Sequence, residues 1–98
     1  MDLTVRFDKI IEKDSPVKAV CSVTLDEAFT VHGVKVIESS KGEFVGMPFE
    51  SFKDAEGNTK RRDLFHPITA QARAELDETV LTAYRALMKM KADAEPAD

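Results

Sequence analysis

The sequence has little cysteine and no tryptophan, and its apolar residues never form a long run. The single cysteine, Cys21, cannot form a disulfide within the chain or complete a cysteine zinc site, which is typical of a reducing compartment. No apolar stretch approaches the roughly 18 residues of a membrane span, and the first residues do not begin a signal peptide. We therefore expect a cytoplasmic protein without a membrane partner.

Motifs that carry chemistry are also missing. The two histidines, His32 and His66, have no metal-ligand spacing with each other or with Cys21. The sequence contains no nucleophile elbow, no glycine-rich phosphate loop and no pair of catalytic carboxylates. We expect no enzymatic activity, no metal, no cofactor and no small-molecule substrate.

The composition is that of one small folded domain, with 98 residues, 43% of them apolar and 33% charged. A net charge of −4 argues against indiscriminate nucleic-acid binding, which usually accompanies a basic domain. The charge is uneven, however, because four basic residues between positions 53 and 62 stand against two acidic ones. The four are Lys53, Lys60, Arg61 and Arg62. A basic patch on an acidic protein is therefore possible.

The first two thirds of the chain are predicted to form strands. Leu3, Val5 and Phe7 alternate with polar residues, which is the pattern of a half-buried strand. Further strands are predicted at residues 19–25, 28–37, 43–47 and 62–65, with a polar turn at residues 53–58. In the third strand the apolar phase changes at Gly33, which predicts a β-bulge there. Pro48 predicts that Met47 lies at a strand end or sheet edge.

A long helix is predicted from Ala70 to about Lys91, with Thr69 as its N-cap. One apolar stripe follows helical spacing: Leu76, Val80, Ala83, Leu87 and Met90. A second stripe lies beside it: Leu81, Tyr84 and Met88. The predicted fold class is α+β, a small and mostly antiparallel sheet of about five strands followed by one long C-terminal helix. Residues 1–92 would form the domain and residues 93–98 an acidic tail.

The central part of the chain resembles the SpoVG family of small bacterial regulators, also called septation regulators. The resemblance is carried by Phe44-Val45-x-Met47-Pro48 and by Arg62-Asp63-x-x-His66-Pro67-Ile68. It extends upstream to Ala19 and downstream to Tyr84. The chain departs from the family pattern at residues 49–52, where a longer segment with Glu50 stands in place of a basic residue.

The resemblance implies a homodimer that binds DNA, with RNA as a second candidate. The implied contacts are basic residues of the central segment and of the helix: Lys53, Lys60, Arg61, Arg62, Arg73, Arg85, Lys89 and Lys91. The helical ones could equally stabilise the end of the helix without any ligand. The strand before Pro48 and the second helix stripe are the candidate dimer interface: Phe44, Val45, Met47, Leu81, Tyr84 and Met88.

Two alternatives remain open from the residues alone. Phe49 and Phe52 could stack on unpaired bases, but anchoring of their segment to the core is favoured. The acidic net charge and Glu50 favour a protein-interaction module that acts on the cell-division machinery without nucleic acid.

Overall fold

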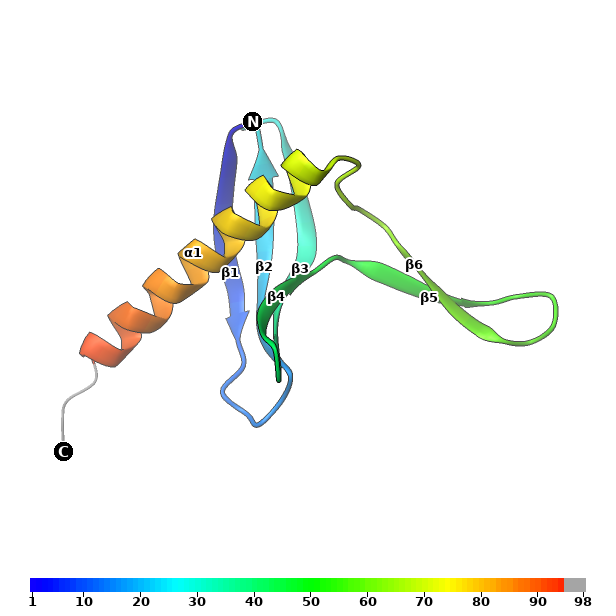
Figure 1. Cartoon of the computed structure of the whole chain (residues 1–98), viewed down its shortest axis with the longest axis horizontal. Coiled ribbons are helices and arrows are strands. Elements are labelled where there is room, and N and C mark those ends of the chain that lie inside the picture. Colours follow the sequence, from blue (N-terminus) through cyan, green and yellow to red (C-terminus); the bar gives the residue numbers. More distant parts are fainter. Residues whose placement is uncertain (95–98) are drawn as a thin grey trace.

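The computed structural model describes residues 1–94, which form a sheet–helix body and a hairpin that projects from it (Figure 1). The elements are β1 (Leu3–Ile10), β2 (Val17–Leu25), β3 (Phe29–Ser39), β4 (Gly42–Gly46), β5 (Phe49–Lys53), β6 (Thr59–Asp63) and α1 (Ala70–Ala94). The predicted α+β class, with an antiparallel sheet and one C-terminal helix, is confirmed.

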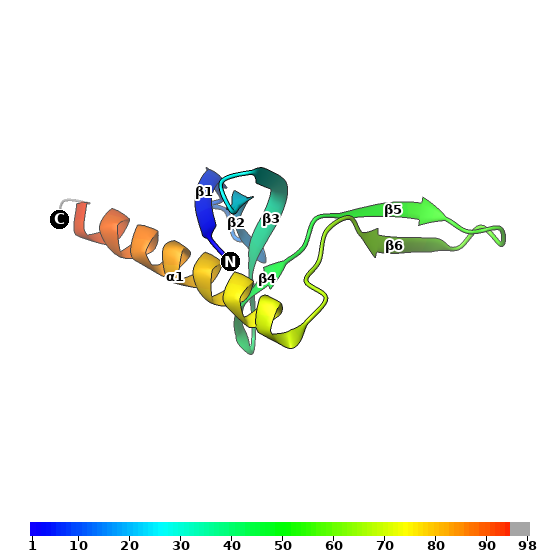
Figure 2. The same ribbon diagram turned by 90° about the horizontal axis from the view of Figure 1, so that it is seen from above.

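The body is an antiparallel sheet in the order β1-β2-β3-β4, with α1 lying across one of its faces (Figures 1 and 2). Alternate side chains of the strands point toward the helix because the side-chain period of a strand is 2. The buried core comes from β2, β3, β4, the residue that directly follows β4, and α1: Ala19, Cys21, Val23, Val34, Val36, Val45, Met47, Leu76, Val80 and Tyr84. The opposite face of the sheet has no covering element among the described residues, and we call it the open face.

The predicted bulge at Gly33 is confirmed. Cys21 pairs with Val34 and Val23 with Val31, so that two residues of β3 lie opposite one residue of β2. Gly33 has a φ of 83°, a conformation that side chains with a Cβ rarely adopt. The extra residue restores the apolar phase, which places Val34 and Val36 in the core.

The helix begins as predicted, because the hydroxyl of Thr69 accepts a hydrogen bond from the backbone N–H of Ala72 at 3.0 Å. Its buried face contains Leu76 and Val80 from the first predicted stripe and Tyr84 from the second, whereas Met90, at the end of the first stripe, is 68% exposed. The helix continues to Ala94, two residues past the predicted domain end. The rest of the predicted tail, residues 95–98, lies outside the described residues. Within residues 1–94, no helix is both long and apolar enough to cross a membrane.

The segment predicted as a polar loop followed by a strand at residues 62–65 is instead a two-stranded hairpin. Strand β5 pairs with β6 from Phe49 opposite Asp63 to Lys53 opposite Thr59, as a separate sheet. The prediction missed β5 because Phe49–Lys53 has no buried face to impose a regular apolar alternation. The hairpin gives the chain a radius of gyration of 15.5 Å, against about 13 Å for a compact domain of this size.

Candidate nucleic-acid interface

The tip of the hairpin is a tight turn held by Asp54. Its carboxylate accepts hydrogen bonds from the backbone N–H groups of Glu56 and Asn58, each at 2.9 Å. Gly57 has a φ of 82° and donates its own N–H to the carbonyl of Asp54 at 3.0 Å. At the other end, the N–H of Leu64 donates to the carbonyl of Pro48 at 2.8 Å. Both ends of the hairpin are therefore fixed by hydrogen bonds.

One side of the hairpin, the Phe52 face, has balanced charge. The strand register places four side chains there: Glu50, Phe52, Lys60 and Arg62. Arg62 pairs with Glu50, with Nε 2.6 Å from the carboxylate, and Lys60 lies 3.6 Å from a carboxylate oxygen of Asp54. Two cations therefore face two carboxylates, and each cation has an acidic partner.

The other side, the Phe49 face, has an excess of positive charge. It presents the remaining hairpin side chains: Phe49, Ser51, Lys53, Thr59, Arg61 and Asp63. The guanidinium carbon of Arg61 lies 4.7 Å from the centre of the Phe49 ring, and the ammonium of Lys35 on β3 lies 5.0 Å from it. Among residues 1–94, neither Arg61, Lys35 nor Lys53 has a carboxylate within ion-pair distance. These three cations are available to a ligand.

The predicted anchoring of Phe49 and Phe52 in the core is wrong. Phe49 is 38% exposed and Phe52 41% exposed, and neither packs against the core cluster. Each ring instead lies beneath a guanidinium group, Arg61 over Phe49 and Arg62 over Phe52 at 5.5 Å. The hairpin projects from the body, so neither ring is buried in the core.

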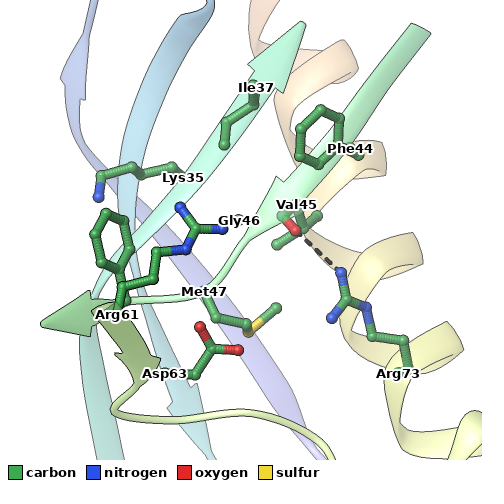
Figure 3. A pocket seen from close by; sticks show the side chains of 10 residues that line it. Lys35, Ile37, Phe44, Val45, Gly46, Met47, Arg61, Asp63 and Arg73 are labelled. Carbon is green, nitrogen blue, oxygen red and sulfur yellow. Dashed lines mark hydrogen bonds between the residues drawn. The ribbon is translucent and has the colours of Figure 1, made fainter. Parts of the chain in front are cut away.

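The basic side chains of the helix are placed differently from those of the hairpin. Arg73 donates to the carbonyl of Val45 on β4 at 3.1 Å (Figure 3). It also pairs with Asp77, one turn further along α1. Arg85 lies 3.3 Å from the carboxylate of Glu43, and Lys91 lies 2.8 Å from that of Glu12. These three residues fasten α1 to the sheet and its loops. Lys89 is exposed and, within residues 1–94, has no carboxylate partner.

The six residues of the predicted dimer interface do not lie on one surface. The side chains of Val45, Met47 and Tyr84 belong to the core of the single chain, at 1%, 6% and 7% exposure. Leu81 and Met88 are partly buried against that core. Phe44 is 45% exposed and points to the open face of the sheet, away from α1. Strand β4 is an edge of the sheet, as predicted from Pro48.

A cavity of about 250 Å³ lies where the root of the Phe49 face meets the edge of the sheet (Figure 3). Its walls combine two aromatic rings, aliphatic groups, three cations and one carboxylate: Phe44, Phe49, Ile37, Val45, Gly46, Met47, Lys35, Arg61, Arg73 and Asp63. In Figure 3 the guanidinium of Arg61 is directed across the cavity toward Gly46. Sequence reasoning missed Lys35, because only the hairpin's position brings it beside Phe49 and Arg61.

A polar cluster on the open face was also missed. The hydroxyl of Ser22, only 2% exposed, donates to Asp8 at 2.5 Å and lies 2.7 Å from Nδ1 of His32. A hydroxyl has one proton, so Nδ1 must be the donor in the second hydrogen bond. The Ser22 hydrogen bond is the main cause that lowers the pKa of Asp8, with Arg6 contributing further. On the helix-facing side of the same strand, burial raises the pKa of Cys21 to about 11.

Sequence comparison finds relatives of this protein over most of the chain. The SpoVG family model matches residues 1–86. A protein of Lachnospira eligens is 45% identical over 85 residues, covering 86% of this chain and 91% of its own length. One of Desulforudis audaxviator is 44% identical with the same coverage, and one of Heliobacterium modesticaldum is 47% identical over 83% of this chain and 85% of its own. Each of the three is named "Putative septation protein SpoVG". The chain belongs to the SpoVG family.

Proposed function

We propose that this protein is a regulator that binds DNA, and also RNA, through the β5–β6 hairpin and acts as a homodimer. The observation that carries the proposal is the unequal charge of the hairpin. Within residues 1–94, Lys53 and Arg61 on the projecting hairpin and Lys35 on the adjacent β3 have no carboxylate within ion-pair distance, although the protein as a whole is acidic. Lysine and arginine side chains placed in this way can grip phosphates, arginine by a two-pronged hydrogen bond and lysine as a point charge.

The biological process follows from the family. Relatives that match the chain over more than four fifths of its length are named for septation. We place this protein in the same setting, as a regulator of septation or of sporulation-type development. A family name of this kind also favours a role without catalysis.

Dimerisation supports the same proposal physically. One hairpin offers few phosphate contacts, and two-fold pairing would double them and the salt dependence of binding. Strand β4 is an edge of the sheet, but its Phe44 lines the cavity at the root of the hairpin. We therefore expect a second copy on the open face over β1, β2 and β3, which leaves that cavity uncovered. The Val45 carbonyl, already bonded to Arg73, would not take part in strand pairing.

Anisotropy titrations with random-sequence duplex DNA, single-stranded DNA and RNA at two salt concentrations test the proposal. The expected result is salt-sensitive binding, with Kd in the micromolar range or tighter. Replacing Lys60, Arg61 and Arg62 together by alanine should abolish binding while light scattering still reports a dimer. Unchanged binding by the triple variant would overturn the hairpin assignment.

A second candidate function is that of a protein-interaction module without nucleic-acid binding. It is favoured by an apolar groove of about 300 Å³ beside the start of α1, lined by Leu3, Leu25, Phe65, Pro67 and Ile68 among others. Ile68 is 87% exposed and Leu64 nearby is 61% exposed. If the titrations show no binding to any nucleic acid at low salt, this becomes the preferred function.

A further inference from the structure

The cavity between β3, β4 and the root of the hairpin has the chemistry of a site for one unpaired base. Two aromatic rings, Phe44 and Phe49, line it together with the aliphatic Ile37. Both rings are partly exposed, at 45% and 38%, and the cations over the Phe49 ring, Arg61 and Lys35, would turn from the ring to the phosphate when a base lies there. Proteins that bind single strands use such rings as platforms on which unstacked bases lie, with basic side chains beside them for the phosphates. We infer that this cavity binds a base of single-stranded nucleic acid, an inference that rests on the proposed function.

The cations at the cavity are suited to the phosphate that follows such a base. Lys35 and Arg61 both lie within 5.0 Å of the centre of the Phe49 ring. Neither has an acidic partner within residues 1–94, so a phosphate would not have to displace a carboxylate. Arg73 also lines the cavity, but its guanidinium is engaged by Val45 and Asp77. Phosphate binding therefore falls to Lys35 and Arg61.

Asp63 gives the site a preference among bases. Its carboxylate lines the cavity and accepts hydrogen bonds, whereas it repels a phosphate. Carboxylates accept from the exocyclic amino group of cytosine, and adenine and guanine also carry amino groups. Thymine and uracil have none. The site should therefore prefer a base with an amino group.

Gly46 keeps the wall of the cavity open. A Cβ at this position would lie 2.6 Å from Cδ1 of Ile37, so a larger residue forces Ile37 to shift. The glycine lets Ile37 lie across the edge strand, next to Phe44. Gly46→Ala adds a methyl group to the wall and disturbs the site without removing a ring or a charge.

The test compares matched phenylalanine variants on the two faces of the hairpin. Phe49→Leu removes the ring from the cavity but keeps an apolar side chain, and Phe52→Leu does the same on the balanced face. Binding to a short oligo(dC) strand and to a random duplex is measured by anisotropy. Quenching of a 2-aminopurine placed in the single strand reports whether a base stacks on the protein.

We expect Phe49→Leu to weaken binding of the single strand about 5- to 150-fold and to abolish the quenching, with little change for the duplex. Phe52→Leu should leave both unchanged, and Gly46→Ala should weaken single-strand binding alone. In the wild type, oligo(dC) should bind more tightly than oligo(dT), and Asp63→Asn should reduce that ratio.

The outcomes separate this inference from the proposed function. A wild-type protein that binds duplex DNA but neither quenches 2-aminopurine nor binds the single strand would overturn the inference and leave the proposed function standing. Equal losses for duplex and single strand in Phe49→Leu would also overturn it, because the ring would then serve only to hold Lys35 and Arg61. No binding to any nucleic acid would overturn both.

Discussion

The body and the hairpin differ in what their basic side chains contact. Aromatic exposure does not separate the two regions, because the body contains both the sheltered Phe7, whose ring centre lies 6.2 Å from that of the buried Tyr84, and the exposed Phe29 and Phe44. In the body, basic side chains contact carboxylates or carbonyls: Arg73 donates to the carbonyl of Val45, and Arg85 pairs with Glu43. In the hairpin, Arg61 lies over the ring of Phe49, and no carboxylate of residues 1–94 is within ion-pair distance of it.

This difference indicates which basic residues are available to bind a phosphate. Arg73, Arg85 and Lys91 would have to give up an acceptor in the body to bind a phosphate, whereas Arg61 and Lys35 have no ion-pair partner within residues 1–94 to give up. Charge counted along the sequence does not make this distinction. Four predicted nucleic-acid residues lie on the helix, and three of them are engaged with the body.

The largest difference between variants of the body and variants of the hairpin is expected in the free energy of unfolding. Leu76→Ala removes a side chain that is 4% exposed, and we expect it to lower the free energy of unfolding by about 2–5 kcal/mol. Phe49→Ala, at 38% exposure, should cost about 1 kcal/mol, mainly from its lost cation contacts. Urea denaturation followed by far-UV circular dichroism measures both. Equal losses would show that the hairpin is part of the cooperative core.

A second prediction concerns the thiol buried in the body. Burial raises the pKa of Cys21 from 9.0 to about 11. At pH 8 the folded protein should therefore hold about a hundredfold less thiolate than the unfolded chain and react correspondingly slowly with a thiol reagent. The raised pKa also means that its contribution to stability is complete below about pH 9 and is lost as the pH rises toward 11. Native labelling as fast as denatured labelling would contradict the packing.

A third prediction compares the two faces of the hairpin. Lys53→Ala with Arg61→Ala, and Lys60→Ala with Arg62→Ala, lower the net charge equally. The first pair removes cations without acidic partners, so we expect about tenfold weaker nucleic-acid binding and a salt slope smaller by about 2. The second pair should have a smaller effect, because its cations already face Glu50 and Asp54. Identical effects of the two pairs on affinity and on the salt slope would contradict this prediction. They would indicate that the net charge attracts the nucleic acid at long range, without direct contacts to the phosphates.

The smallest effect is expected on the open face. The Ser22 hydroxyl lowers the pKa of Asp8, so the ionised carboxylate stabilises the fold above its unfolded-state pKa near 4. This contribution is lost as the pH falls through the lower folded-state pKa. Ser22→Ala should reduce stability at pH 6 and flatten its dependence between pH 6 and pH 2, as followed by thermal melts. An unchanged pH dependence of stability would show that this hydrogen bond does not contribute to the free energy of unfolding.

Much of the body could be predicted from the sequence because burial imposes a pattern on it. The phase change at Gly33 predicted the bulge, Thr69 predicted the helix cap, and the spacing of Leu76 and Val80 predicted the buried helix face. The predicted stripe fails at its end, because Met90 is 68% exposed, and the C-terminal turns of α1 extend beyond the sheet (Figure 1).

The hairpin and its cavity could be predicted only in part. The turn residues and the basic run were visible, but β5 buries no face and so leaves no alternation to detect. Whether a cation is neutralised depends on register: Arg62 lies opposite Glu50, whereas Arg61 lies opposite Ser51. Lys35 is 26 positions away from Arg61 in the sequence and meets it only through the fold.

The most direct test is an NMR titration of the labelled protein with single-stranded DNA, following every backbone amide. If the hairpin is the interface, the largest shift changes should fall on Phe49–Lys53, Thr59–Asp63 and Lys35, with α1 nearly unchanged. Chemical-shift changes centred on the last turns of α1, without changes in the hairpin, would contradict the assignment. They would indicate that the helix is the interface.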